Sequence, residues 1–401
     1  MRRIIFLVDM NAFFISCEST RHPEIIGKPA AVAGDPKNRA GIILTANYEA
    51  RKFGVKTTMV LHKALELCPN MIIIPPDHKF YKRKSKEVMD ILSEYTPVIE
   101  QNSIDEAWLD MTGCQGIFGS PYESAKRIMK HINNKLGLKC SIGISENKFL
   151  AKMASEMKKP LGITELWKKD IELKLWPLPV QFMHGVGKQT TQKLHKMGVK
   201  TIGELALSDR RYIAKKLGKI GAEICQLANG IDISQIKPRS QNDLKSIGKS
   251  IILSRDISDI DSAKIVLMKL SDEVGMAARR YDKKGRTVQI NIKYSNFQCI
   301  TRQTTVPATY LVQEIYSAGV KMLCKSWNRQ LPVRLLGISL SGFDRDNNNE
   351  QISIFNMLET VNEKNDLDKI DKIETTINNI RQKYGSSIIN RGILMKKGNK
   401  N

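Results

Sequence analysis

The sequence predicts an α+β protein of several domains, and three observations lead to that fold class. The chain has 401 residues, a length at which two to four domains are expected and a single core is unusual. Its first 172 residues alternate strand-like apolar runs with amphipathic segments of helical period. A lysine-rich stretch of helical period follows, and residues 287–294 then alternate strictly between apolar and polar side chains, as a half-buried strand does.

The first strand-like run ends in a carboxylate. Residues 3–8 are almost continuously apolar, as in a strand covered on both faces, and they are followed by Asp9. Met10, Asn11, Phe13 and Phe14 come next. An anion directly after a buried strand needs a cation or a hydrogen-bond donor nearby, so Asp9 is a candidate site residue.

A second acidic feature lies in residues 103–110, where Asp105 and Glu106 stand side by side between two short apolar runs. The simpler interpretation is a solvated hairpin turn. Together with Asp9, however, the pair makes an all-oxygen set that suits Mg²⁺, with Mn²⁺ as the alternative. Two such ions fit in-line phosphoryl transfer. On an ideal strand the two side chains point to opposite faces, so a shared ion requires a turn or bulge there.

The remaining elements of the first 172 residues form a sheet with helices on one face and the carboxylates on the other. We expect a short polar helix at 18–28, strands at 29–34, 42–45 and 72–74, and helices at 48–53, 60–67, 81–95, 122–136 and 147–157. A Pro- and Gly-containing turn at 158–162 carries Lys159, which is either a ligand contact or simply solvated.

The sequence pattern of residues 173–235 predicts a helical domain with a helix-hairpin-helix. Its turn contains Gly185, Gly187 and Lys188 between apolar-periodic segments, with many further lysines around it. Exposed backbone N–H groups in such a turn hold a DNA phosphate without reading the base sequence. An ordinary glycine turn is the alternative, but the dense positive charge favours phosphate binding.

A polar linker at 236–246 leads to a second α+β unit at 247–343. We expect a four-stranded sheet covered on one face by helices at 263–281 and 310–325, with strands that include 287–294, 299–306 and 336–341. The tail, 344–401, begins with a polar run and includes Gln351, Ile354 and Phe355, followed by a short helix at 370–384. Two apolar anchors after a polar stretch suit a docking peptide, and the alternative is an edge strand or helix folded back on the preceding domain.

Composition and charge indicate which classes of partner the chain is expected to bind. A net charge of +23 and a pI near 9.6 favour nucleic acid, and no basic amphipathic stretch favours a membrane. Seven scattered cysteines without a Cys-x-x-Cys pair indicate a reducing compartment, and the early apolar run is too short for a signal peptide, so we expect a cytoplasmic protein. Six histidines show no metal spacing, which argues against structural zinc.

Several motifs resemble the Y-family translesion DNA polymerases, most closely the DinB type. They are Asp9-Met10 with the aromatic pair after it, residues 47–54 (NYEARKFG), 103–110 (SIDEAWLD) and 143–148 (GISENK). The resemblance implies a right-hand polymerase: palm and fingers in residues 1–172 with fingers at about 18–76, thumb at 173–235, little finger at 247–343, and a clamp-binding peptide in the tail.

The resemblance also implies the site residues. Asp9, Asp105 and Glu106 would be the catalytic carboxylates and, with the Met10 carbonyl, would hold two Mg²⁺. Phe14 would be the steric gate against ribonucleotides, although Phe13 and Phe14 are alternatively both core residues. The nucleotide contacts would be Phe13, Phe14, Thr45, Tyr48, Arg51 and Lys159, and the sliding-clamp contacts would be Gln351, Ile354 and Phe355.

The expected function is therefore template-directed addition of deoxynucleotides to a primer, as low-fidelity translesion synthesis in DNA repair and damage tolerance. The partners would be primer-template DNA, deoxynucleoside triphosphates and the sliding clamp, and the chain would act as a monomer. The alternative from another class is a non-catalytic DNA-binding repair factor, and a nucleotidyl cyclase on a similar fold is weaker. Retention of all three carboxylates argues against the non-catalytic factor.

Overall fold

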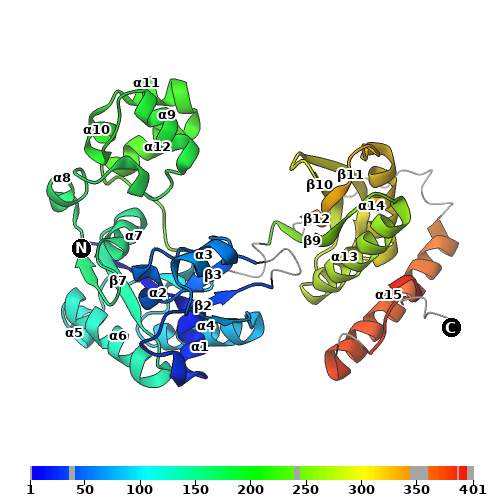
Figure 1. Ribbon diagram of the computed structural model, residues 1–401, viewed down its shortest axis with the longest axis horizontal. Helices are drawn as coiled ribbons and strands as arrows, with labels where there is room; N and C mark the ends of the chain where they lie inside the picture. Colours follow the sequence, from blue (N-terminus) through cyan, green and yellow to red (C-terminus); the bar gives the residue numbers. More distant parts are fainter. Residues whose placement is uncertain (1, 36–40, 239–243, 344–359, 386–387, 395–401) are drawn as a thin grey trace. The chain divides into compact units, whose positions relative to one another are not determined.

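The computed structural model describes residues 2–35, 41–238, 244–343, 360–385 and 388–394 (Figure 1). The chain divides into two compact units, the first extending to residue 239 and the second beginning at residue 240. Each unit has its own hydrophobic core, as expected for a chain of this length. Within the described ranges, no helix combines the length and the apolar character needed to cross a membrane.

The main sheet of the first unit has five strands in the order β5-β6-β1-β7-β8. Its strands are β1 (Ile5–Met10), β5 (Ile99–Gln101), β6 (Glu106–Asp110), β7 (Cys140–Ser145) and β8 (Ile163–Glu165). The central strand β1 is buried along its whole length and pairs antiparallel with both β6 and β7, which explains its nearly continuous apolar sequence. This register places Asp9 opposite Glu106.

Helices cover both faces of this sheet. Phe6 and Val8 of β1 pack in the same core as residues of α4 (His78–Ser93) and α6 (Pro121–Leu136). On the other face Ile5 and Leu7 pack with Ala151 of α7 (Lys148–Met157). The expectation that all helices lie opposite the carboxylates was therefore wrong, because α7 packs on the same face as Asp9.

Gly143 explains how α7 comes so close to the sheet. A Cβ added at Gly143 would stand 2.0 Å from the Ala151 carbonyl oxygen and 2.4 Å from the Ser155 backbone nitrogen. Real Cβ atoms do not approach other atoms that closely, so only glycine permits this packing of helix on strand. The missing side chain in β7 thus fixes the position of α7 over β1.

The smaller sheet of the first unit has the order β3-β2-β4. It consists of β2 (Ala30–Ala33), β3 (Ile43–Ala46) and β4 (Ile72–Ile74), with α2 (Tyr48–Lys52) and α3 (Leu61–Leu67) close to the expected bounds. The helix expected at 18–28 is instead α1 (Phe13–Ser19), followed by a 3₁₀ turn at Pro23–Ile25. The helix begins earlier because Phe13, Ile15 and Cys17 bury their side chains in the core.

The lysine-rich stretch forms short helices. They are α8 (Ile171–Lys174), α9 (Lys188–Lys196), α10 (Ile202–Leu207), α11 (Arg210–Leu217) and α12 (Lys219–Ala228), with 3₁₀ turns at Lys168–Asp170 and Val180–Phe182. Their core also includes Phe149, Leu150 and Met153 of α7, so the helical region and the main sheet share α7 between them. After α12, Ile236 returns to the sheet beside Ile5 and Leu7.

The second unit contains an antiparallel sheet in the order β11-β10-β12-β9. Its elements are β9 (Ser246–Ile257), α13 (Ile260–Arg280), β10 (Gly285–Tyr294), β11 (Cys299–Thr309), α14 (Val312–Ser326) and β12 (Val333–Phe343). Val288, Ile290 and Ile292 face the core beneath the two long helices, which is the alternation that the sequence showed.

A last helix, α15 (Thr360–Tyr384), is joined to the second unit by buried ion pairs. Arg381 donates to Asp272 of α13 at 2.6 Å, and Glu374 pairs with Arg279. The sequence predicted a short helix at 370–384, whereas the helix begins ten residues earlier. A short 3₁₀ turn at Gly392–Leu394 follows it, and Arg391 just before that turn bonds to both Asp272 and Glu374.

Candidate active site

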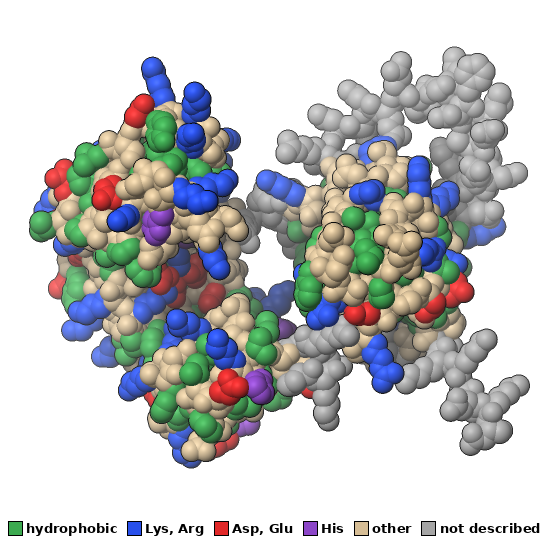
Figure 2. Space-filling model, turned by 45° about the horizontal axis from the view of Figure 1, so that its top comes forward, with side chains coloured by type: hydrophobic (Ala, Val, Ile, Leu, Met, Phe, Trp, Pro, Cys, Tyr) green, Lys and Arg blue, Asp and Glu red, His purple; other side chains and the backbone are tan. Residues whose placement is uncertain are grey.

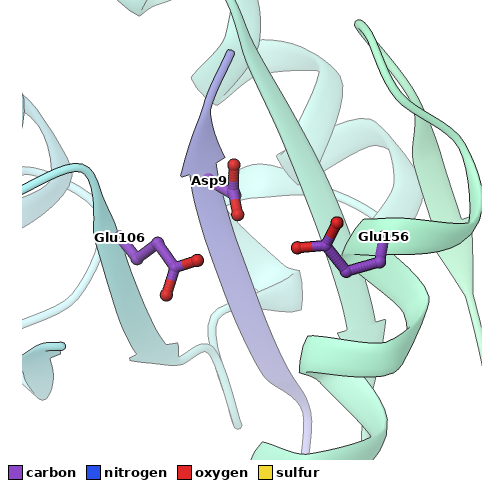
Figure 3. Close-up of side chains that lie close together, drawn as sticks. All are labelled: Asp9, Glu106 and Glu156. Carbon is purple, nitrogen blue, oxygen red and sulfur yellow. The ribbon is translucent and has the colours of Figure 1, made fainter. Parts of the chain in front are cut away.

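Three carboxylates converge on the α7 face of the main sheet (Figure 3). Asp9 comes from β1, Glu106 from β6 and Glu156 from α7, and each offers an oxygen within 4.8 Å of the others. Asp9 is only 5% exposed. Three negative charges this close repel strongly in a buried setting, so the fold must supply positive charge to hold them.

Two lysines supply that charge. Lys152 Nζ lies 3.3 Å from Asp9 Oδ2 and 3.0 Å from Glu156 Oε1, and it also bonds to Glu106. Lys159 Nζ lies 2.8 Å from both Asp9 Oδ2 and Glu156 Oε1. Each ammonium group is therefore shared between carboxylates from different elements. Figure 2 shows acidic side chains recessed within this unit, with Lys and Arg side chains around them.

The protonation of Asp9 is linked to that of Glu106. Burial and a hydrogen bond with Glu106 raise the pKa of Asp9, outweighing the opposite effect of Lys159. Burial also acts to raise the pKa of Glu106, but the bonds with Asp9 and Lys152 outweigh it and lower that pKa. Near neutral pH the metal-free pair thus tends to hold one proton, on the Asp9 side.

Asp105 lies next to this group without joining it. It immediately precedes β6, so Asp105 and Glu106 are not two successive residues of one regular strand. Its carbonyl accepts from the Met10 N–H at 2.9 Å, which ties it to the end of β1. Its carboxylate accepts from the Ser103 hydroxyl at 2.5 Å. The Asp105 side chain is thus half-buried beside the end of β1, outside the three-carboxylate group.

Asn11 positions the turn that carries Lys159. The buried Asn11 amide donates to Ser141 Oγ at 3.0 Å, and its side-chain oxygen accepts from the Leu161 N–H at 3.0 Å. These bonds join the end of β1, strand β7 and the turn after α7. Lys159 therefore extends toward Asp9 from a turn whose backbone is held by Asn11. The sequence alone did not indicate this support.

Tyr48 and Arg51 lie together on α2. The Arg51 guanidinium stands 4.8 Å from the centre of the Tyr48 ring, and its Nε donates to the Ala46 carbonyl at 2.9 Å. Burial raises the pKa of Tyr48, while the charges of Arg51 and Lys159 lower it. Thr45 lies in β3 and is half-buried. The charges of Asp9, Glu156 and Lys159 act on Tyr48, so α2, which follows β3, lies near the carboxylates.

The two phenylalanines after β1 differ in their surroundings. Phe13 is 2% exposed and belongs to the core. Phe14 is half-buried and stacks on Tyr81, with ring centres 4.4 Å apart and planes at 13°. Phe14 therefore presents part of its ring outside the core, whereas Phe13 does not.

The helix-hairpin-helix turn is open. Gly185 has a φ of +90°, Gly187 caps the amino end of α9, and a Cβ at either residue would meet no atom within 4 Å. Lys188 is the first residue of α9 and is exposed. The backbone N–H groups at this helix end are thus accessible to an anion. Gln351, Ile354 and Phe355 lie outside the described residues.

Sequence reasoning missed Glu156 and Lys152. Both lie on α7, and the carboxylates they meet are on β1 and β6, more than 40 positions away in the chain. A local signal was present, because Glu156 is four residues after Lys152 and three before Lys159, a spacing that pairs opposite charges on a helix. That spacing alone predicts only a solvated ion pair, so it did not reveal the site.

The donor set fits a hard divalent cation. The three acidic groups at the site offer oxygen, and no cysteine or histidine is among the metal-binding groups found in the described parts of the chain. Mg²⁺ prefers carboxylate oxygens, while zinc prefers nitrogen and sulfur. The two ammonium groups already between these carboxylates indicate that the site holds positive charge stably.

Three family profiles match successive parts of this chain. The profile of the impB/mucB/samB family matches residues 8–156, and that of the family's C-terminal domain matches residues 244–354. The helix-hairpin-helix motif of the same family matches residues 168–199. The three matches follow one another along the chain in the order main sheet, helical region and second unit.

Curated relatives match over almost the whole chain. DNA polymerase IV of Clostridium kluyveri is 76% identical over 99% of this chain and 99% of its own length. DNA polymerase IV of Alkaliphilus oremlandii is 54% identical over 98% of this chain and 100% of its own length. Among solved structures, a Y-family DNA polymerase chimera has the same fold, with a TM-score of 0.76 at 24% identity over 85% of this chain and 99% of its own.

Proposed function

We propose a two-metal phosphoryl transfer for this chain, on the premise that it belongs to the impB/mucB/samB family and is a Y-family DNA-directed DNA polymerase. Template-directed DNA synthesis follows from that membership. The observation that supports the two-metal mechanism is the register of β1 on β6, because it places Asp9 opposite Glu106 with both carboxylates aimed at one point (Figure 3).

Asp9, Asp105 and Glu106, with the Met10 carbonyl, are the residues proposed to hold two Mg²⁺. When bound, these ions lower the pKa of the primer 3′-hydroxyl and offset charge on the leaving pyrophosphate. The protein contributes orientation, because β1 and β6 fix Asp9 and Glu106, and the bond from Met10 to the Asp105 carbonyl fixes Asp105. Mn²⁺ also prefers oxygen ligands and is an alternative ion for this site.

Tyr48, Arg51 and Lys159 are proposed to bind the β- and γ-phosphates of the incoming nucleotide, with Thr45 and Phe13 as further proposed nucleotide contacts. Two cations and a hydroxyl suit a triphosphate, because charge-assisted hydrogen bonds to phosphate are strong. Lys159 bonds to Asp9 and Glu156. When a triphosphate binds, Lys159 would exchange these carboxylate bonds for bonds to phosphate oxygens. Phe14 is proposed as the steric gate that excludes a ribose 2′-hydroxyl.

DNA contacts are proposed for Gly185, Gly187 and Lys188 of the helix-hairpin-helix, and for the second unit. An open glycine turn at a helix amino end suits a phosphate. We retain the division into palm and fingers (1–172), thumb (173–235), linker (236–246), little finger (247–343) and tail (344–401) as part of the proposal.

Translesion synthesis and clamp attachment complete the proposed function. A small, basic polymerase of this family would copy damaged templates, and Gln351, Ile354 and Phe355 would attach it to the sliding clamp by a docking peptide. The peptide is proposed from its sequence alone. A weak peptide is sufficient, since clamp and polymerase bind the same DNA and so raise each other's effective concentration.

Primer extension tests the proposal. The full chain with Mg²⁺ should extend a primer on an undamaged template and past a defined base adduct, whereas a DNA-binding repair factor would bind the same DNA without extending it. Extension that stops at every adduct would remove the translesion role and leave the polymerase assignment intact. Clamp-stimulated extension that is lost in the double variant Ile354→Ala, Phe355→Ala supports the peptide, and unchanged stimulation contradicts it.

A further inference from the structure

Lys152 is the one buried cation of the site that the proposed mechanism does not use. Its side chain is 9% exposed and bonds to Asp9, Glu106 and Glu156. Lysine is rarely buried unless it is paired, and here it is paired with two carboxylates that the proposed function assigns to Mg²⁺. A cation cannot serve these carboxylates at the same time as a metal ion without strong repulsion.

The third partner of Lys152 gives it an alternative position. Glu156 lies four residues later on α7, so the two side chains are neighbours on one helix face. The Glu156 side chain is 48% exposed, and it comes from α7, whereas Asp9 and Glu106 come from the sheet. An ammonium group that gives up its bonds to Asp9 and Glu106 therefore keeps one carboxylate without any movement of the helix.

We propose that Lys152 is a positioning residue that occupies the carboxylate site as an internal cation and withdraws to Glu156 when Mg²⁺ binds. This inference rests on the proposed metal site. In the metal-free protein Lys152 bonds to Asp9, Glu106 and Glu156 and offsets the negative charge that these carboxylates bring together. On metal binding it competes for the same oxygens, so it weakens the affinity of the site, and Glu156 relieves that competition.

Competition predicts effects of definite sign. Lys152→Met keeps the length of the side chain and removes its charge, so the metal affinity should rise by roughly fivefold or more. The melting temperature of the metal-free protein should fall, because three carboxylates then face Lys159 alone. Simple damage to the site would weaken metal binding instead. Glu156→Gln removes the alternative partner, so it should lower the metal affinity.

Two controls separate the proposal from other roles. Lys148→Met removes a partly buried lysine from the same helix, and Lys148 pairs with Glu100 at 2.7 Å, outside the carboxylate group. It should leave metal affinity unchanged. The double variant Lys152→Met, Glu156→Gln tests whether Glu156 acts through Lys152. If it does, Glu156→Gln has no effect once Lys152 is gone, whereas a direct metal ligand would lose affinity in both backgrounds.

The experiment titrates Mn²⁺ into the full chain without DNA or nucleotide and measures free Mn²⁺ by electron paramagnetic resonance, with melting curves in parallel. Tighter binding in Lys152→Met, weaker binding in Glu156→Gln and no added effect in the double variant support the proposal. Equal or weaker binding in Lys152→Met overturns it. If Lys152→Met does not fold, unchanged or tighter binding in Glu156→Gln overturns it. A parent protein that binds no Mn²⁺ would instead overturn the proposed metal site.

Discussion

Phe14, the proposed steric gate, also packs against neighbouring rings. Its ring stacks on Tyr81 and stands edge-on to His78, with centres 5.8 Å apart, yet the residue stays half-buried. A gate must be rigid to exclude one extra hydroxyl, and ring contacts on two sides make it so. The stack is therefore compatible with the proposed gate.

Phe14→Ala should increase the use of ribonucleotides relative to deoxyribonucleotides by about tenfold or more, because the ring that blocks the 2′-hydroxyl is removed. Single-nucleotide incorporation with both sugars measures the ratio. Phe118→Ala is the matched control, since Phe118 is also a half-buried ring against a tyrosine, 4.9 Å from Tyr95. If both variants lose only stability and the ratio does not change, Phe14 is a packing residue.

The raised pKa of Asp9 predicts a pH-dependent metal affinity. Burial and the bond with Glu106 raise the pKa of Asp9 to about 7, so below that pH a proton occupies the metal-free site. Metal binding must release this proton, so affinity should be highest above the raised pKa and fall as the pH decreases, by at most about tenfold per pH unit. Calorimetric Mg²⁺ titrations in buffers of different ionisation enthalpy measure the proton release. An affinity that is constant from about pH 8 to about pH 6 would contradict the shift.

At the scale of elements, the position of α7 decides the site. This helix carries Lys152 and Glu156, leads into the turn with Lys159, and lies against β7 where Gly143 has no side chain. Gly143→Ala places a Cβ against the α7 backbone, so it should lower the free energy of unfolding by about 1–3 kcal/mol and reduce incorporation together with it. Denaturant unfolding and single-nucleotide incorporation on the same preparation check this.

Gly116→Ala provides the comparison, because a Cβ at Gly116 in the short helix Gln115–Phe118 would meet no atom within 4 Å. That variant should leave both stability and incorporation close to those of the parent. Equal losses in the two variants would mean that the contact between Gly143 and α7 does not set the site.

Local patterns predicted the elements better than their assembly. The strand before Asp9, the helix at 147–157 and the alternating strand at 287–294 followed from hydrophobic period alone, and each is present within a few residues. The position of α7 on the carboxylate face depends on a contact between Gly143 and Ala151. No period in either segment encodes such a contact, so Glu156 was not predicted to meet Asp9.

At the scale of the whole chain, we expect the net positive charge to determine the affinity for DNA. With 64 lysines and arginines against 41 acidic residues, affinity for primer-template DNA should fall steeply with salt, by about a thousandfold between roughly 50 and 200 mM. It should depend little on base sequence, since phosphate contacts carry no sequence information. Fluorescence anisotropy over a salt series with two unrelated duplexes tests both points. A salt-insensitive complex, or a strong preference for one duplex, would be evidence against this mode of binding.

The order of main sheet, helical region and second α+β unit followed from composition and motifs. The cores themselves are not continuous in sequence, because α7 also packs in the helical core and Ile236 returns to the main sheet. The three-carboxylate group was only partly predictable, since Asp9 and Glu106 stand after or within short apolar runs while Glu156 reads as part of an ordinary charged helix face. The docking of α15 by Asp272 and Glu374 was not predictable, because buried ion pairs between distant helices leave no local pattern.

The most direct measurement is the single-turnover rate of nucleotide incorporation at saturating Mg²⁺, with DNA affinity measured alongside, for Asp105→Ala, Glu106→Ala and Glu156→Ala. If Asp105 and Glu106 hold the metal ions, the first two variants lose about a thousandfold or more in rate and bind DNA as the parent does. Glu156→Ala retains most of the rate, because it acts through Lys152 and saturating Mg²⁺ compensates. A near-parental rate in Asp105→Ala, with the large loss in Glu156→Ala instead, would contradict the assignment and make Glu156 the third metal ligand.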